Sequence, residues 1–146
     1  MLFRSVLLDK GYVGSVKEAF DTLLREGNGY YIPARRLGAL ATVSFIRAYG
    51  GRAILAHPFL NLDEAGLLDF LPQAKEAGLE GMETRYTEFD RETTRRAEAL
   101  AARFRLMESG GSDFHGEAKP DIRLGRGWGA LEVPFSFYEA LAGQTT

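Results

Sequence analysis

Cysteine is absent from this sequence of 146 residues, and histidine occurs only twice. The lack of cysteine excludes disulfide bonds, thiolate-bound metal ions and cysteine nucleophiles. No apolar run approaches the roughly 20 residues that a membrane-spanning helix needs, and the first residues lack the pattern of a signal peptide. We therefore expect a cytoplasmic protein without a membrane partner.

The sequence also has little net charge. Its 18 basic and 20 acidic residues leave a formal charge of −2, which is too weak a field to steer the whole chain onto nucleic acid or anionic lipid. Hydrophobic residues make up 45% of the chain, enough to form a core, and the length is typical of one domain. The composition therefore predicts a folded protein.

Helical patterns come first along the chain, and helices then alternate with short strands. Ser15 and Glu18 form a capping box, and the apolar residues that follow recur at helical spacing. Further helices are expected at about residues 37–49, 63–77 and 91–103, with strands at 52–56, 79–83 and 105–108. A last apolar stretch at 130–133 precedes a terminal helix. The alternation predicts an α/β fold with parallel strands.

Polar residues follow each of the three expected strands. His57 ends the first, Glu83 ends the second, and Asp113 and His115 follow the third. Because the carboxyl ends of parallel strands meet at one edge of a sheet, we expect these side chains to share a rim. So few strands do not close a barrel, and an open sheet edge would favour pairing with another chain, for example as a homodimer.

The stretch GGSDFHG, residues 110–116, places an aspartate and a histidine two positions apart between glycines. Both side chains bind divalent ions, and such mixed sites suit manganese, iron, zinc or magnesium. His57 could join them, and Glu83 could complete the shell or orient a histidine. A site of this kind hydrolyses phosphate esters by activating a water molecule and neutralising phosphate oxygens.

Simpler roles fit the same residues. A lone Asp-x-His turn is usually a solvated loop, and a histidine before proline is often hydrogen-bonded for structural reasons. Glu88 and Asp90 are typical of a helix start, and Arg85 of a protein surface. Several aromatic residues are expected to be core or packing residues, namely Tyr30, Tyr31, Phe45 and the region of Trp128.

Four features together resemble one family: GGRAILAHP at 50–58, the glutamate at 83, GSDFHG at 111–116 and KPDIRLG at 119–125. They are similar to the C-terminal half of the PHP (polymerase and histidinol phosphatase) domain phosphoesterases. The most similar branch hydrolyses nucleoside 3′,5′-bisphosphates or trims short RNA from the 5′ end. The stretch LLDKGYVGSVKEAF at 7–20 resembles the helical insertion of that branch.

The resemblance implies a partial, distorted barrel of the (β/α)7 type. Residues 1–34 would be the helical insertion, and residues 35–146 the C-terminal part of the barrel. His57, Asp113 and His115 match metal ligands of the family, and Glu83 matches a residue near the site. Lys119 or Arg123 would face the substrate phosphate.

The family's His-x-His strand, further histidines and bridging glutamate have no counterpart in these 146 residues. We therefore expect a truncated metal-dependent phosphoesterase with a nucleotide or short RNA substrate in its complete form. The chain alone would have little or no activity, and its metal would be bound at reduced occupancy or not at all. The alternative is a non-catalytic domain that pairs with an N-terminal half or dimerises for binding or scaffolding.

Overall fold

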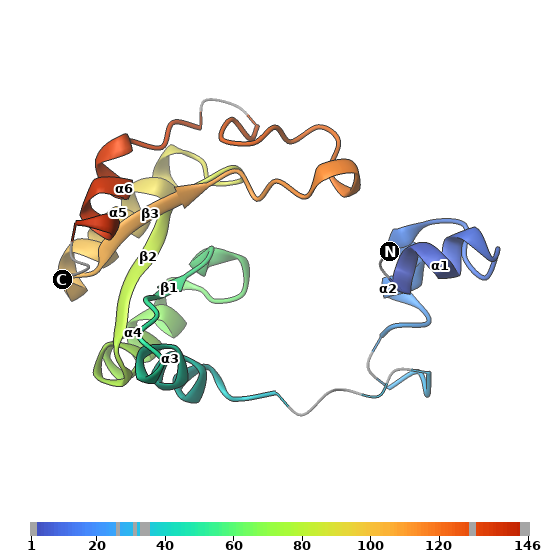
Figure 1. Cartoon of the computed structure of the whole chain (residues 1–146), viewed down its shortest axis with the longest axis horizontal. Helices are drawn as coiled ribbons and strands as arrows, with labels where there is room; N and C mark the ends of the chain where they lie inside the picture. The colour runs from blue at the N-terminus through green and yellow to red at the C-terminus, as the bar shows by residue number, and fades with distance from the viewer. Residues whose placement is uncertain (1–2, 26, 31, 33–35, 129–130, 144–146) are drawn as a thin grey trace. The chain divides into compact units, whose positions relative to one another are not determined.

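The computed structural model describes residues 3–25, 27–30, 32, 36–128 and 131–143 (Figure 1). The chain divides into two units, Met1–Arg36 and Leu37–Thr146. The first unit contains two short helices, α1 (Phe3–Asp9) and α2 (Val16–Asp21). That this unit is an insertion in a larger fold stays a prediction.

The capping box that begins α2 is confirmed in part. The Ser15 hydroxyl accepts a hydrogen bond from the backbone N–H of Glu18 at 3.0 Å. The Glu18 carboxylate accepts from the backbone N–H of Gly14 at 2.7 Å, one residue earlier than in a standard capping box. The helix ends at Asp21, shorter than the apolar pattern predicts, and the Thr22 hydroxyl donates to the Glu18 carbonyl at 2.6 Å there.

The second unit is a mixed α/β structure around a small parallel sheet. The order of its strands is β1 (Ala53–Leu55), β2 (Leu79–Tyr86) and β3 (Met107–Gly111), so β2 lies in the centre. Four helices accompany the sheet: α3 (Ala39–Ala48), α4 (Glu64–Ala77), α5 (Arg91–Phe104) and α6 (Phe135–Ala142). Short 3₁₀ turns follow β1 and β3, at Pro58–Leu60 and Gly116–Ala118. The predicted alternation of helices and parallel strands is confirmed.

The two long helices begin at aspartates and end at left-handed residues. Asp63 accepts a hydrogen bond from Gly66 N at 2.8 Å, and Asp90 accepts one from Thr93 N at 2.7 Å. Each carboxylate thereby satisfies a free N–H group of the first turn. Gly78 ends α4 with φ 109°, a conformation that glycine adopts without strain. These local signals fix the lengths of the two crossover connections.

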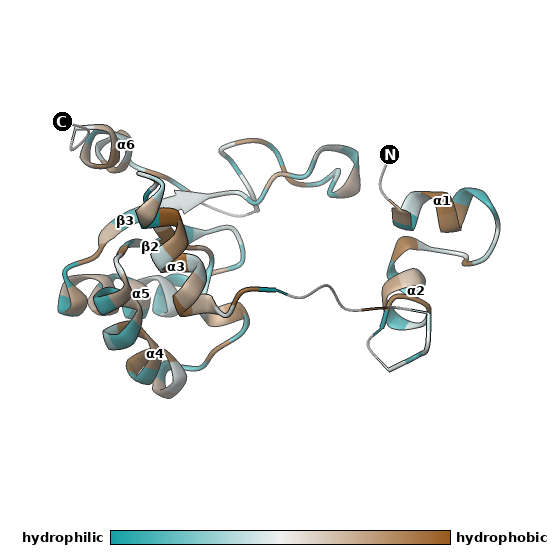
Figure 2. Ribbon diagram, turned by 60° about the horizontal axis from the view of Figure 1, so that its bottom comes forward, coloured by the Kyte–Doolittle hydropathy of each residue, from teal (hydrophilic) through white to brown (hydrophobic). Residues whose placement is uncertain are grey.

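The core lies where α3, α4 and α5 pack on β1 and β2. Leu67 and Leu71 of α4 and Met82 of β2 are fully buried, and Leu100 of α5 is nearly so. In Figure 2 α4 and α5 carry both hydrophilic and hydrophobic stretches, as amphipathic helices do. No helix in the described ranges is long and apolar enough to cross a membrane.

The expected packing of the aromatic residues is confirmed only in part. Leu131–Val133 leads into α6 without forming a helix or strand, and residue 130 lies outside the described residues. Tyr30 and Phe45 are exposed rather than in the core, and Trp128 is half exposed; Tyr31 lies outside the described residues. Phe45 instead packs on Tyr49, one turn further along α3, with 4.6 Å between the ring centroids. Aromatic character alone does not determine burial, because packing partners decide it.

Candidate functional site

All three strands end at the same edge of the sheet, and one tyrosine connects their ends. Tyr86, the last residue of β2, is almost fully buried. Its ring centroid lies 5.6 Å from that of His57, which follows β1. Its hydroxyl donates to Asp113 Oδ2, beyond the end of β3, at 3.2 Å. His57 and Asp113, 56 positions apart in the numbering, therefore both contact one buried side chain.

Asp113 is held as a carboxylate by its neighbours. Lys119 Nζ donates to Asp113 Oδ2 at 2.6 Å, and this hydrogen bond lowers the pKa of Asp113 below its ordinary value, although burial opposes the effect. The residue has φ 54°, in the left-handed region that aspartate and asparagine tolerate better than most residues. Lys119 thus neutralises the carboxylate, a contact that the sequence did not predict.

His115 is oriented by the backbone of the same turn. Its Nδ1 lies 2.7 Å from the carbonyl oxygen of Asp113 and 3.4 Å from Asp113 Oδ1. A carbonyl only accepts, so Nδ1 carries the proton and Nε2 of the neutral ring is left with a lone pair. The side chain is half exposed. This is the tautomer that a metal-binding histidine needs.

Two polar atoms at this edge are buried without a hydrogen-bond partner in the described part of the chain. They are His57 Nδ1 and Glu83 Oε2; a third such atom, Arg85 Nε, belongs to a guanidinium that pairs with Glu98. His57 also has φ 67°, a conformation that is uncommon for a residue with a side chain. Buried polar atoms are normally paired, so these two atoms mark a place where a cation or a polar ligand fits the donor set.

The Glu83 carboxyl group has a pKa above its ordinary value. Burial, together with the negative charge of Asp113, raises its pKa from 4.5 to about 7. A side chain at Gly111 would approach Glu83 Oε1 to 3.2 Å, so the glycine leaves room for the carboxylate. Near neutral pH, Glu83 is therefore poised between its protonated and ionised forms.

We expect Glu83→Gln to remove a pH dependence of stability. Because the folded protein binds this proton more tightly than the unfolded chain, Glu83 contributes stability that is fully present below pH 4.5 and lost as the pH rises through about 7. The pKa difference sets an upper limit of about 3 kcal/mol on this contribution to the free energy of unfolding. Screening by solvent at this half-buried position reduces the contribution to about 1–2 kcal/mol.

Urea unfolding in EDTA at pH 5 and pH 8.5 measures this effect. The wild type should lose more free energy of unfolding between the two pH values than Glu83→Gln does. Glu76→Gln, at an exposed position of α4, serves as the matched control and should behave like the wild type. Equal pH dependence in all three proteins would contradict the assignment.

The remaining predicted residues lie on the same loop or nearby. Arg123 is exposed on the segment that follows the second 3₁₀ turn. Glu88 Oε1 lies 3.4 Å from the Tyr86 hydroxyl, so it belongs to the rim rather than to the helix start. Within the described ranges, no three side chains of the histidine, aspartate and glutamate types gather closely enough to hold a metal ion by themselves. The predicted ligands thus share an edge without forming a closed cage.

Sequence reasoning missed Tyr86. The strand was expected to end at Glu83, which placed Tyr86 in a loop. The register of β2 against β3 shifts between Glu83 and Arg85, and the strand continues beyond this irregularity. A run of alternating residues through Arg85 and Tyr86 was the available signal.

Comparisons with known proteins show what the chain resembles. No family model matches the chain. The chain is 30% identical over 125 residues to 5′-3′ exoribonuclease Rnm of Escherichia coli (strain K12), a match that covers 85% of the chain and 42% of that enzyme. It is 40% identical over 68 residues to phosphoribosyl 1,2-cyclic phosphate 1,2-diphosphodiesterase of Eggerthella lenta, covering 47% of the chain and 24% of that protein.

Solved structures give the same result. A structure described as a metal-dependent phosphoesterase from Bifidobacterium adolescentis matches 95% of the chain and 48% of its own length, with a TM-score of 0.69 and 27% identity. Over the matched residues, the chain is similar to proteins described as phosphoesterases and an exoribonuclease. An amidohydrolase from Chromobacterium violaceum, solved with sulfate and no metal, matches 80% of the chain and 42% of its own length, with a TM-score of 0.66 and 25% identity.

The PHP-type resemblance predicted from the motifs is thereby confirmed. The chain spans less than half the length of each of these four proteins. The mixed α/β architecture with a small parallel sheet is common to the chain and the phosphoesterase fold. The roles of individual residues stay predictions.

Proposed function

We propose that this chain supplies part of the metal site of a phosphoesterase that hydrolyses nucleotide phosphate esters, either 3′,5′-bisphosphates or short RNA. The observation that carries the proposal is the link through Tyr86, which brings His57 and Asp113 to one edge of the sheet. The names of the relatives support a phosphate-ester substrate, since one is an exoribonuclease and another a cyclic phosphate diphosphodiesterase.

The types of donor at this edge suit a divalent cation, while the described residues do not bring three of them together around one point. Asp113 would provide a carboxylate, His115 its Nε2 and His57 its Nδ1, while Glu83 would bind directly or hold a ligand in place. Oxygen and imidazole nitrogen donors suit manganese, iron, zinc or magnesium. Such a cation, when bound, supplies a water molecule of lowered pKa and neutralises phosphate oxygens.

The protein's own groups hold defined protonation states for this chemistry. Burial, with the carboxylates of Asp113 and Glu88, raises the pKa of Tyr86 above its ordinary value, so its hydroxyl stays a hydrogen-bond donor rather than a base. Lys119 keeps Asp113 ionised. The Lys119 ammonium also stands at the mouth of the site, where a substrate phosphate could take it from Asp113.

The three parallel strands would form part of a distorted (β/α)7 barrel, with residues 1–34 as a helical insertion. The family's His-x-His segment and bridging glutamate do not occur in these 146 residues. We therefore expect the chain alone to bind the cation with few protein ligands and to hydrolyse its substrate slowly.

Release of phosphate from adenosine 3′,5′-bisphosphate in the presence of Mn²⁺ tests the proposal. We expect slow release above the rate in buffer with Mn²⁺, and its loss in Asp113→Asn. Calorimetry adds a second readout: the bisphosphate and Mn²⁺ should each raise the affinity of the other, because they share a site. Independent binding of the two, together with an unchanged rate in Asp113→Asn, would rule the proposal out.

A further inference from the structure

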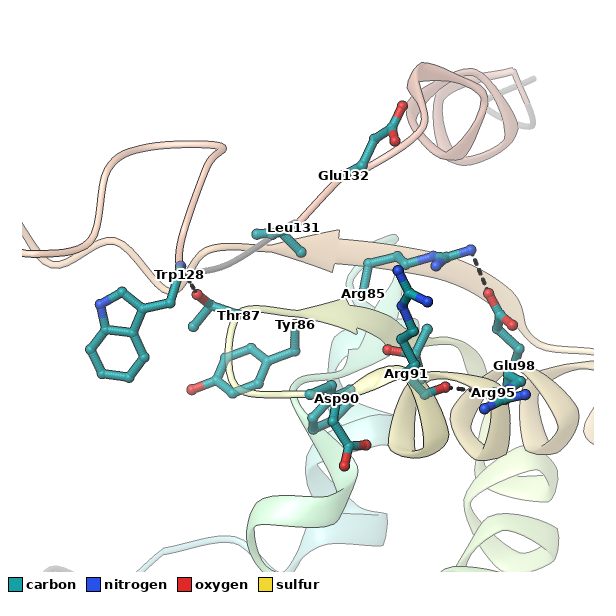
Figure 3. Close-up of a pocket in the computed structure, with 12 residues that line it drawn as sticks. Arg85, Tyr86, Thr87, Asp90, Arg91, Arg95, Glu98, Trp128, Leu131 and Glu132 are labelled. Atoms are coloured by element: carbon teal, nitrogen blue, oxygen red, sulfur yellow. Dashed lines mark hydrogen bonds and ion pairs between the residues drawn. The ribbon is translucent and has the colours of Figure 1, made fainter.

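A cleft of about 860 Å³ adjoins the candidate metal site (Figure 3). Its walls come from the end of β2, the first turns of α5, and the residues Trp128, Leu131 and Glu132. Tyr86 lines this cleft and also donates to Asp113, so one side chain separates the cleft from the predicted ligands. The volume is in the range of small-molecule binding sites.

One end of the cleft is aromatic. Trp128 leaves half of its surface exposed, and in Figure 3 its indole lies toward the same end as the Tyr86 ring. The backbone N–H of Trp128 donates to Thr87 Oγ1 at 2.5 Å, which ties the tryptophan to the end of β2. Gly127 has φ 53°, and a side chain there would overlap the Thr87 side chain. The backbone that carries the indole is therefore fixed, while its ring face stays open to a ligand.

The other end of the cleft is cationic. Arg91 and Arg95 lie one turn apart on α5, and the Arg95 Nε donates to the Arg91 carbonyl at 3.1 Å. Neither forms an ion pair within the described part of the chain. Arg85, by contrast, is paired with Glu98, with 2.5 Å between Nη2 and Oε1. Both Arg91 and Arg95 are exposed.

The carboxylates of the cleft are mostly engaged. Glu98 binds Arg85, and Asp90 caps its own helix through Thr93 N. Glu132 lines the cleft as well, and its charge partly offsets the two exposed arginines. This balance favours a ligand with a single phosphate at the cationic end over a chain of several phosphates.

We infer that this cleft binds a nucleotide, with the base stacked on Trp128 and a phosphate held by Arg91 and Arg95. Aromatic rings stack on any base, and arginine forks match phosphate oxygens. Tyr86, which contacts Asp113, lies at the aromatic end of the cleft. A second phosphate of the same nucleotide would be directed past Tyr86 toward the candidate metal site. The inference deepens the proposed function, on which its orientation depends, and makes Trp128, Arg91 and Arg95 specificity-determining residues.

Trp128 is the only tryptophan of the sequence, so its fluorescence reports on the cleft alone. We expect saturable quenching by adenosine 3′,5′-bisphosphate in EDTA, where the predicted ligands hold no metal ion. A 5′-phosphorylated triribonucleotide represents short RNA and is titrated in the same way. Whichever of the two ligands binds more tightly, the bisphosphate or the triribonucleotide, indicates the class of the natural ligand. Inorganic phosphate and adenosine, tested separately, should each bind at least about tenfold more weakly than the bisphosphate, because each satisfies one end of the cleft.

Substitutions at each end of the cleft test which part of the nucleotide that end binds. The double variant Arg91→Gln/Arg95→Gln should lower the affinity at least about tenfold and flatten its dependence on salt. Arg103→Gln, on the last turn of the same helix and outside the cleft, is the single-site control, and pairing it with Arg105→Gln matches the change in net charge. Trp128→Leu, measured by calorimetry, should weaken binding by about tenfold while its melting temperature stays close to that of the wild type.

Absence of quenching at millimolar bisphosphate would overturn the inference. Equal weakening by the Arg103/Arg105 pair would do the same, since it would indicate non-specific charge attraction. The two proposals can fail separately. Nucleotide binding in EDTA without any Mn²⁺-dependent hydrolysis would support nucleotide binding in the cleft and refute the proposed phosphoesterase activity. Hydrolysis without quenching of the Trp128 fluorescence would support the phosphoesterase activity and refute nucleotide binding in the cleft.

Discussion

Asp113→Asn should lower the affinity of the chain for Mn²⁺ by about 100-fold or more, because the substitution removes the charged oxygen ligand and keeps the shape of the side chain. Asparagine is the appropriate replacement. Asp113 has φ 54°, and asparagine tolerates this left-handed conformation, whereas alanine would add backbone strain and confuse the result.

Calorimetric titration with Mn²⁺ measures the effect, and thermal unfolding shows whether the variant is folded. The lost contact with Lys119 is partly exposed, so we expect a change in stability of no more than about 1 kcal/mol. Asp121→Asn, at an exposed position of the same loop, is the control and should bind Mn²⁺ as the wild type does. Unaltered binding in Asp113→Asn would show that the cation sits elsewhere.

Gly81→Ala should destabilise the second unit by about 3 kcal/mol or more. Gly81 lies in β2, the central strand, and is paired with Ile54 of β1 and Met107 of β3. A methyl group there would come within 2.8 Å of both Ile54 Cδ1 and the Met107 carbonyl oxygen. The backbone of β3 cannot move away without breaking its ladder to β2, so the sheet must separate locally.

Urea unfolding monitored by far-ultraviolet circular dichroism measures this loss. Gly38→Ala is the matched control, since a methyl group there meets no atom within 4 Å and the backbone has φ −63°. Gly38 is the N-cap of α3, where alanine is less favourable than glycine, so we expect Gly38→Ala to lower the free energy of unfolding by no more than about 1 kcal/mol. A Gly81→Ala protein as stable as the control would mean that the three strands are not packed as described.

The elements that local chemistry specifies were predictable from the sequence. Ser15 and Asp90 are N-cap residues in the structure, because a side-chain oxygen beside free N–H groups acts over a few residues only. The alternation of helices and short apolar strands likewise identified the parallel sheet. The shared edge of His57 and Asp113 followed from strand direction, since parallel strands all end on one side.

Contacts between distant segments were not predictable. The Asp113 carboxylate is bound by Tyr86, from another strand, and by Lys119, across a loop, and no local pattern specifies either partner. Trp128 looked like a core residue because it is large and apolar. Its exposure depends on Gly127 and Thr87, which hold its backbone at the end of β2. A single sequence does not reveal such tertiary contacts.

The central claim is that His57 and His115 approach one cation from different strands. The chain contains only these two histidines, so the NMR spectrum of its imidazoles contains two sets of signals, and His57→Gln assigns them. Paramagnetic Mn²⁺ at a small fraction of the protein concentration should broaden both sets in parallel, and both should sharpen again with EDTA. Broadening of the His115 signals alone, with those of His57 unchanged, would contradict the shared site.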